Sequence, residues 1–341
     1  TEYVFTSQGR WGIVLLQKLL FPARFTPFFT AFLSLALLCC GACLSSAAMR
    51  LRGMERHFFC VAFVAFPQFA YQTAFSMQSD CVAFGFVCSA ISVLLFKRYA
   101  EGGSKLFLPL SAAAYVLALG IYQALAVVPP LLYMLAALER LLPGGDAYTR
   151  ERLKKEIADC SAFACLALFS LAIYCIVYKI SLVITGIPSG GHLLGYVGWG
   201  VGSFSGTVKN VLGEVALHLK GGHYHGEALF VTACVPLAAV ALGVLRVRPG
   251  LVLAWGLAVL VAVVAIPFMQ IVGLGQGQPP RAMLGQGMLF AGIWALSWRV
   301  IAWHKLTVVC IAAAFVLFSS AHVSRLFFTN DLNYEADRLL A

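Results

Sequence analysis

The stretch LALGIYQALAVVPP (117–130) decides the fold, because it lies in the middle of an apolar run from Leu106 to Leu138. A run of that length is either one long membrane span with Gln123 buried halfway along it, or two short helices that meet at Gln123. The two alternatives place every later segment on opposite sides of a membrane. The positions of the basic residues distinguish them.

The composition indicates a membrane protein made of helices. Of the 341 residues, 61% are hydrophobic and only 11% are charged, and the mean hydropathy is +0.88. Soluble domains average about 25% charged residues. Repeated long apolar runs are typical of membrane-spanning helices, so we expect an all-α polytopic membrane protein of about ten transmembrane helices. We expect these helices at 27–49, 57–76, 80–97, 105–120, 121–138, 161–178, 228–245, 249–273, 282–298 and 303–322.

Lys and Arg residues are concentrated in one alternate set of loops and nearly absent from the short loops of the other set if 105–138 is a hairpin. That set holds fifteen of them, in 50–56, 97–105, 140–155, 246–248 and 299–305, whereas the short loops of the other set hold only Arg281. Cytoplasmic loops carry an excess of Lys and Arg. A single long span would place the second and third clusters on opposite sides and remove the bias. The hairpin is therefore favoured, and the net charge of +10 reports topology, with no nucleic acid expected as a partner.

This topology assigns the remaining segments. We expect one transmembrane domain over 1–341, with 1–26 as the first extracytoplasmic loop, 180–227 as a long Gly-rich extracytoplasmic loop and 323–341 as an extracytoplasmic tail. The charged stretch 144–160 is expected on the cytoplasmic side as a solvated loop or a short surface helix. A further helix is expected before the first residue.

Polar side chains gather on the predicted extracytoplasmic side. Polar groups at membrane depth are costly and usually mark a functional site. The guanidinium of Arg matches phosphate oxygens, a carboxylate can act as a general base, and Gln, Trp and Tyr suit sugar hydroxyls and ring faces. The candidates are Glu2 and Asp80 as catalytic groups, Arg10 and Arg281 as phosphate-binding groups, and Gln8, Trp11, Gln72, Gln78, Tyr122 and Gln123 as sugar- or acceptor-binding groups.

Each of these residues also has a purely structural alternative. Arg10 and Arg281 could be interfacial anchors. Asp80 could be the N-cap of the helix that begins there. Gln72 and Gln123 could be hydrogen-bonding contacts between helices. The strongest evidence for a functional site is that all of these residues are predicted on the same side of the membrane.

The loop 180–227 offers a weaker alternative, a metal site. His218, His223 and His225 lie in the stretch HLKGGHYHGE, and none of their spacings is diagnostic of a metal site. We expect ordinary loop histidines and no metal or other cofactor.

Several short motifs occur in a recognisable order. They are SQGRWG (7–12), LLQKLL (15–20), FPQFAYQTAFS (66–76), LALGIYQA (117–124) and TNDLNYEADRLLA (329–341). Together they resemble the bacterial type II membrane glucosyltransferases that modify lipopolysaccharide O-antigen, over nearly the whole chain.

The resemblance implies a GT-C-like glycosyltransferase in the bacterial cytoplasmic (inner) membrane. Its donor would be a sugar, expected to be glucose, on a polyprenyl-phosphate carrier, and its acceptor a glycan such as lipopolysaccharide on the extracytoplasmic side. Such proteins carry an acidic pair followed by an aromatic residue in the first outer loop. Here Glu2 and Tyr3 match, while Thr1 replaces the first acidic residue. The resemblance thus implies as the base either Glu2 alone or an Asp upstream of the first residue, and the polar cluster offers Asp80 as a further alternative.

Two rival functions come from other classes. A flippase or transporter of lipid-linked sugars would use the same cationic cavity without a carboxylate, and would tend to show inverted repeats. No internal repeat is visible in the sequence. A scaffold subunit of an envelope assembly would not require the polar cluster.

Overall fold

The computed structural model describes residues 2–20, 26–73, 78–142, 150–188, 197–200, 202–220, 227–247, 250–301 and 304–340. Within these ranges the regular elements are all helical, which confirms the predicted all-α fold. In chain order they are α1 (Glu2–Ser7), α2 (Trp11–Leu19), α3 (Pro27–Ala48), α4 (Gly53–Val64), α5 (Gln68–Thr73), α6 (Ser79–Ala100), α7 (Phe107–Ile121), η1 (Gln123–Val127), α8 (Val128–Leu141), α9 (Arg150–Thr185), α10 (Phe204–Lys220), α11 (Glu227–Val247), α12 (Leu251–Ala265), η3 (Ile266–Phe268), α13 (Met269–Leu274), η4 (Pro280–Ala282), α14 (Gly285–Ser297) and α15 (Lys305–Leu340).

Six described helical segments are long and apolar enough to cross a membrane. They are Phe28–Ala48, Ser79–Ala100, Gln123–Leu141, Arg150–Thr185, Leu251–Leu274 and Lys305–Arg325. Two shorter apolar helices, Phe107–Ile121 and Ala233–Arg246, accompany them. The chain is a polytopic membrane protein, with fewer full-length spans in the described residues than the ten expected.

The chain turns in the middle of the apolar run 106–138. α7 ends at Ile121, and Tyr122 adopts an extended conformation with φ −155° and ψ 120°. The short helix η1 follows, and two prolines, Pro129 and Pro130, lie at the start of α8. Proline is tolerated in the first turn of a helix, because the N–H groups there have no hydrogen-bond partner within the helix. The run is therefore two helices, as predicted.

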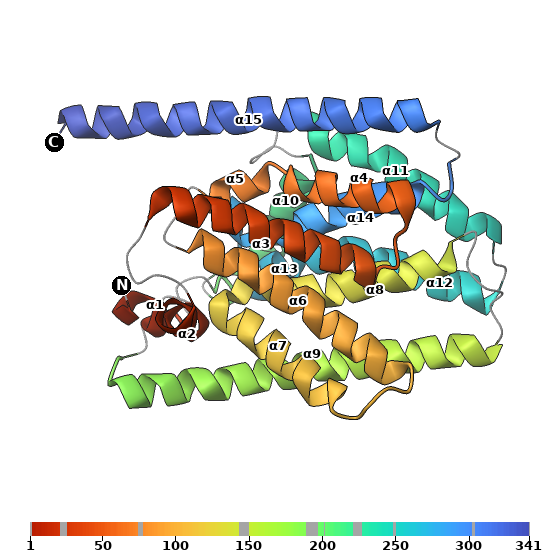
Figure 1. Cartoon of the computed structure of the whole chain (residues 1–341), viewed down its shortest axis with the longest axis horizontal. Coiled ribbons are helices and arrows are strands. Elements are labelled where there is room, and N and C mark those ends of the chain that lie inside the picture. The colour runs from red at the N-terminus through yellow and green to blue at the C-terminus, as the bar shows by residue number, and fades with distance from the viewer. Residues whose placement is uncertain are drawn as a thin grey trace.

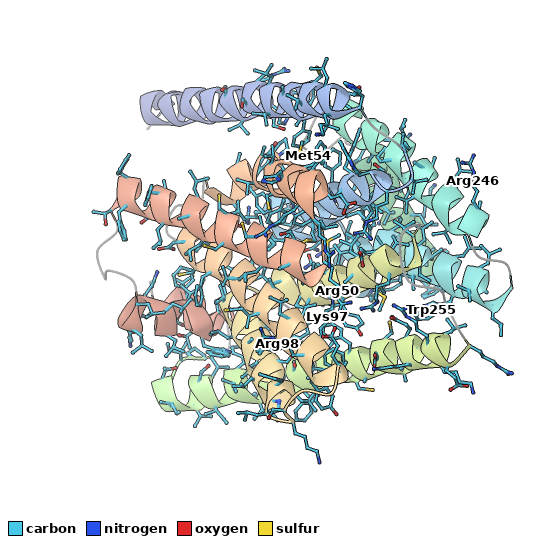
Figure 2. The ribbon with its side chains drawn as sticks, turned by 45° about the vertical axis from the view of Figure 1, so that its right-hand side comes forward. Arg50, Met54, Lys97, Arg98, Arg246 and Trp255 are labelled. Atoms are coloured by element: carbon cyan, nitrogen blue, oxygen red, sulfur yellow. The ribbon has the colours of Figure 1, made fainter. Side chains whose placement is uncertain are left out.

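The loops rich in Lys and Arg lie at one end of the bundle. In Figure 1 the adjoining ends of α3 and α4, α6 and α7, α8 and α9, α11 and α12, and α14 and α15 lie toward the right, and α1, α2 and α5 lie toward the left. Figure 2 turns the right-hand side forward and shows Arg50, Lys97 and Arg98 there. The two sets of loops inferred from charge therefore occupy opposite ends of the bundle.

An ion cluster ties three elements together at this basic end. Arg299 donates to both carboxylate oxygens of Glu55, at 3.0 and 3.2 Å from Nε, and also to Glu139. These side chains are between 9% and 17% exposed. Burial alone would lower the pKa of Arg299, but its bonds to Glu55 and the charge of Glu139 outweigh burial and raise the pKa. The cluster fixes the loop after α14 to α4 and α8.

The predicted span 57–76 is wrong as a single helix. α4 ends at Val64 and α5 begins at Gln68, with Pro67 between them. Proline lacks the N–H that would continue the helix and disfavours a helical conformation at the residue before it. This break gives the chain a bend beside the candidate site described below.

Three segments expected outside the membrane spans contain helix, and for 144–160 a short surface helix was one of the two expectations. The charged stretch 144–160 is helical from Arg150 onward, because it forms the first turns of α9, which runs without interruption to Thr185. The ion pair between Arg140 and Glu156, at 2.7 Å, anchors this part of α9 to α8. The segment 180–227 contains the last turn of α9 and all of α10, and the segment 323–341 continues α15 to Leu340.

Candidate functional site

Arg10 lies at the centre of a polar cluster at the end of the bundle opposite the basic loops. It sits between α1 and α2, and its Nη1 donates to Oε1 of Gln78 at 3.0 Å. The guanidinium carbon lies 4.7 Å from the centroid of the Tyr122 ring, which is cation–π geometry. Three of the predicted site residues, distant in sequence, are therefore brought together.

Hydrogen bonds from α9 and the hairpin tip hold the turn between α1 and α2. Nε2 of Gln123 donates to the carbonyl of Gln8 at 2.7 Å and to the hydroxyl of Tyr174 at 2.8 Å. The same hydroxyl donates to the carbonyl of Gly9 at 3.1 Å, and Tyr178 donates to the carbonyl of Ser7 at 2.8 Å. The structure thus uses the amide of Gln123 as a contact between segments, which is the structural alternative for this residue.

Close backbone approach fixes α2 against α7. A Cβ atom added at Gly120 would lie 2.5 Å from the ring of Trp11, and one added at Gly12 would lie 2.7 Å from the backbone of Gly120. Only glycines allow this approach, since real Cβ contacts are never so short. The indole of Trp11 is therefore a packing group between these two helices, and Arg10 is positioned by the residue next to it.

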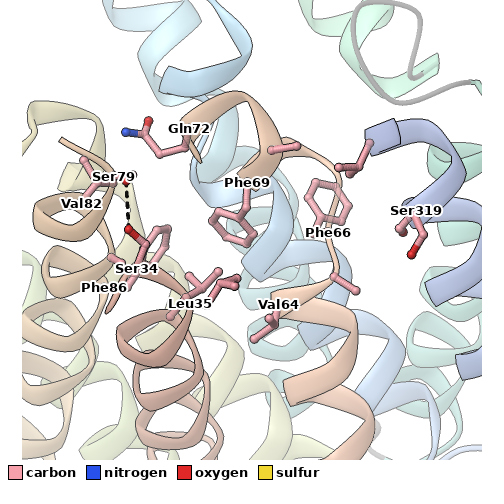
Figure 3. A pocket seen from close by; sticks show the side chains of 16 residues that line it. Ser34, Leu35, Val64, Phe66, Phe69, Gln72, Ser79, Val82, Phe86 and Ser319 are labelled. Atoms are coloured by element: carbon pink, nitrogen blue, oxygen red, sulfur yellow. Dashed lines mark hydrogen bonds between the residues drawn. The ribbon is translucent and has the colours of Figure 1, made fainter. Parts of the chain in front are cut away.

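Gln72 lies beside an apolar cleft with no hydrogen-bond partner for its amide among the described residues. Its side chain is 4% exposed, and neither Oε1 nor Nε2 is bonded. The cleft has a volume of about 220 Å³ and is bordered by α3, α4, α5, α6 and α15. Figure 3 shows Gln72 and Ser79 near one end of it and Phe66, Phe69 and Val64 along its wall. A buried unpaired amide is costly, so this position suits a polar ligand group.

The start of α6 joins the cleft to the Arg10 cluster. Gln78 accepts the bond from Arg10, and the next residue, Ser79, lines the cleft and accepts a hydrogen bond from Ser34 at 2.9 Å. Asp80 follows, 8% exposed, and its Oδ1 accepts from the backbone N–H of Cys81 at 2.7 Å. The N-cap is Gln78, so the alternative of Asp80 as the N-cap is wrong. A carboxylate in the first turn is still favoured by the helix dipole.

Glu2 and Arg281 lie on other elements, and η4, which carries Arg281, packs against α5, the helix of Gln72. Glu2 is 60% exposed and forms an ion pair with Lys18 at 3.0 Å. Arg281 lies in η4 and is partly exposed. Both are accessible at the surface.

The histidine predictions divide between described and undescribed residues. His223 and His225 lie outside the described residues. His218 was predicted as a loop histidine, which is wrong: it is 1% exposed on α10, and its Nδ1 lies 3.1 Å from Nε2 of Gln286. The reason is that α10 packs against the bundle at α11 and α13. In the described ranges, no three His, Cys, Asp or Glu residues are grouped so as to hold a metal ion.

Tyr174 and Tyr178 contact the candidate site, and the sequence analysis did not identify them. They lie four residues apart in the apolar part of α9, so they share one helix face. That spacing was the available signal, because two hydroxyls on one face of an apolar helix need partners. Their partners are the carbonyls of the α1–α2 turn.

The arrangement fits an anion that is attached to an apolar chain. A guanidinium stacked on an aromatic ring binds an anionic oxygen, and the neighbouring cleft accepts an apolar group. The two features meet at consecutive residues, Gln78 and Ser79.

A family model described as Glucosyl transferase GtrII matches residues 3–297. No curated protein and no solved structure matches the chain. The matched range includes Arg10, Gln72, Gln78 and Tyr122.

Proposed function

The chain belongs to the GtrII family of glucosyl transferases, and from this premise we propose that it moves glucose from a polyprenyl-phosphate carrier to a cell-surface glycan such as lipopolysaccharide O-antigen. The transfer takes place on the extracytoplasmic side of the bacterial inner membrane, in keeping with the distribution of Lys and Arg. The family makes the chain a glycosyltransferase, which favours this proposal over a transporter of lipid-linked sugars.

The observation that carries the proposal is the junction of Arg10 with the apolar cleft. A lipid-linked sugar presents an apolar chain, then a phosphate, then the sugar. The cleft of about 220 Å³ offers a place for part of the chain, and Arg10, bonded to the residue next to the cleft, offers a cation for the phosphate. Inside a bilayer the chain gains little from leaving lipid, so the role of the cleft is to orient the phosphate.

The proposed reaction is a single inverting displacement. The acceptor hydroxyl attacks the anomeric carbon, and the bond from that carbon to the phosphate oxygen breaks with its electron pair remaining on the phosphate. Arg10, with Arg281 as a second cation, stabilises the charge that grows there. Glu2, or alternatively Asp80, accepts the proton of the hydroxyl. Gln72, with its unbonded amide, is the leading group for binding the sugar, together with Gln8.

The test of the site is a transfer assay with the full chain in nanodiscs, radiolabelled polyprenyl-phosphate glucose and extracted lipopolysaccharide. We expect Arg10→Gln to lower the rate by about 10²- to 10³-fold, the usual cost of losing one transition-state donor. The matched control is Lys209→Gln, which removes an exposed cation from α10. Full activity of Arg10→Gln, or an equal loss in the control, would contradict the assignment.

The same assay assigns the base. Loss of a general base costs about 10²- to 10⁴-fold, so a loss of that size in Glu2→Gln with normal Asp80→Asn activity makes Glu2 the base. The reverse result makes Asp80 the base. If both variants keep full activity, neither carboxylate is the base.

A further inference from the structure

The face of α15 that packs on the bundle carries a serine where it reaches the apolar cleft. Val308, Phe315 and Ser319 share this face, because they are spaced by seven and four residues along the helix. Val308 is 2% exposed, and the ring of Phe315 stacks on that of Phe290 in α14, with their centroids 5.1 Å apart. One turn further on, Ser319 lines the cleft of about 220 Å³. α15 is therefore one wall of this cleft.

The hydroxyl of Ser319 is buried without a partner. The residue is 2% exposed, and its Oγ has no hydrogen-bond partner among the described residues. A serine within a helix can donate to the carbonyl four residues earlier. Ser34, on the other side of the same cleft, does so with the carbonyl of Thr30 at 2.7 Å, whereas Ser319 does not. An unpaired buried hydroxyl costs free energy that a hydrophobic side chain at this position would not.

The amide of Gln72 is a second buried polar group in this cleft without a partner in the described part of the chain. Figure 3 shows Gln72 on one side of the cleft and Ser319 on the other, with the rings of Phe66 and Phe69 between them. The two groups come from helices that are far apart in the sequence. Two such groups on opposite sides of one cleft indicate a ligand that supplies hydrogen-bonding atoms to both.

The rest of the cleft lining limits the chemistry of that ligand. The lining is mainly apolar, and the described residues that form it include no charged side chain. A hydroxyl and an amide are neutral groups that can each donate and accept hydrogen bonds, so they suit the oxygen atoms of a sugar or a phosphate ester. The apolar walls suit a hydrocarbon chain. A ligand with both parts is a lipid-linked sugar.

We propose that α15 forms one wall of the donor site and that Ser319 hydrogen-bonds an oxygen atom of the donor's sugar-phosphate head, on the side opposite Gln72. This inference rests on the proposed transfer from a polyprenyl-phosphate carrier. It extends the donor site from α5 and α6 to α15, and it gives the unpaired hydroxyl of Ser319 a partner that is present only when the donor is bound.

The experiment is native mass spectrometry of the full chain in detergent, titrated with polyprenyl-phosphate glucose and, in parallel, with polyprenyl phosphate that carries no sugar. Ser319→Ala should raise the Kd of the glucose donor by about two- to tenfold, the usual net value of one hydrogen bond. Ser319→Thr keeps the hydroxyl and should bind as the unaltered chain does. An equal loss with both ligands assigns the bond to a phosphate oxygen, and a loss with the glucose donor alone assigns it to a sugar hydroxyl.

Thermal unfolding without donor separates binding from a structural role. Ser319→Ala removes a buried hydroxyl that lacks a partner, so its Tm should equal or exceed that of the unaltered chain. A lower Tm would show that the hydroxyl stabilises the fold and would contradict the proposal. The matched control is Ser324→Ala, an exposed serine of α15 that does not line the cleft. An equal loss of donor affinity in this control would also overturn the proposal.

A pair of larger substitutions tests the wall itself. Ser320 and Ala321 are both exposed, but only Ser320 lines the cleft. Ser320→Trp should weaken donor binding by about tenfold or more, the scale of steric overpacking, whereas Ala321→Trp should bind normally.

The transfer assay, run in parallel, distinguishes failure of this inference from failure of the proposed function. Donor binding and transfer by the unaltered chain, with normal affinity in Ser319→Ala and Ser320→Trp, would overturn the inference and leave the transfer function standing. Neither binding nor transfer by the unaltered chain would contradict both. Weaker binding in Ser319→Ala, with no transfer by the unaltered chain, would support the site and contradict the transfer.

Discussion

At the scale of single residues, the structure separates polar groups that are used internally from those left for a ligand. Gln123 is used internally, because its amide nitrogen bonds Gln8 and Tyr174. Gln72 is more deeply buried, at 4% exposed, but has neither amide atom bonded in the described part of the chain. The two glutamines at this end of the bundle therefore differ in role. Gln123 bonds other segments of the chain, and of the two only Gln72 has an amide that is available to a ligand.

The internal role of Gln123 gives a stability prediction. We expect Gln123→Leu to destabilise the chain by about 1–3 kcal/mol, because it leaves the carbonyl of Gln8 unpaired in a partly buried site. Tyr174→Phe removes the hydroxyl that accepts a hydrogen bond from Gln123. The double variant should therefore lose less free energy of unfolding than the sum of the losses in the two single variants. Thermal unfolding in detergent measures all three variants.

The control for this cycle pairs Gln123→Leu with Ser111→Ala. Ser111 bonds the carbonyl of Ser92 at 2.8 Å and lies twelve residues earlier, about 18 Å along a helix. The effects of these two changes on the free energy of unfolding should be additive. Additive behaviour of Gln123→Leu with Tyr174→Phe would contradict the shared bond.

At the scale of elements, the contact between α2 and α7 positions Arg10, which directly precedes α2. The contact depends on Gly12 and Gly120, which approach too closely for any Cβ atom. α2 is only nine residues long, so it depends on this contact and on the hydrogen bonds of the α1–α2 turn for its position. Arg10 is thus held in place through the contacts that α2 and the α1–α2 turn make with neighbouring helices.

We therefore predict that Gly120→Ala displaces α2. The added methyl group meets the ring of Trp11, and overpacking of this kind costs about 1–3 kcal/mol. Transfer activity should fall together with stability, because Arg10 moves with α2. Gly213→Ala on α10 is the control, since a Cβ there meets nothing within 4 Å, and alanine stabilises a helix relative to glycine. Normal activity and Tm in Gly120→Ala would contradict the predicted displacement.

At the scale of the whole molecule, the two ends of the bundle differ in chemistry. The end with the basic loops holds the Arg299 ion cluster and a cavity lined by Arg, Lys, Glu and Asp side chains at the ends of α6, α8 and α9. The other end holds Arg10, its partners and the nearby apolar cleft. This polarity favours an orientation with the basic end in the cytoplasm.

The orientation can be tested with two matched cysteine variants. Ser203→Cys, just before α10, should react with a membrane-impermeant maleimide in intact cells. Ser104→Cys, in the connection between α6 and α7, should react only after the membrane is permeabilised. Both serines are exposed in the structure. Reaction of Ser104→Cys alone in intact cells would reverse the orientation and place the candidate site in the cytoplasm. The unaltered chain, which contains eleven cysteines of its own, gives the background.

The sequence by itself determined the class of the protein, the turn at Gln123 and the grouping of the loops. Hydropathy and the distribution of Lys and Arg are local properties that add along the chain, so each can be evaluated without knowing which helices touch. The family motifs are also local, and the match over residues 3–297 bears out the resemblance that they indicated.

Only the tertiary structure decided which polar residues meet. Arg10 contacts Gln78 and Tyr122 across long stretches of sequence, and such contacts depend on how each helix is rotated about its axis. In a helix as apolar all round as α7 or α12, no sequence period defines that rotation, so it is set by close packing at positions such as Gly120. For the same reason the sequence placed Gln123 and Gln72 on one face of the membrane but did not distinguish the amide that is bonded inside the protein from the amide that lies beside the cleft.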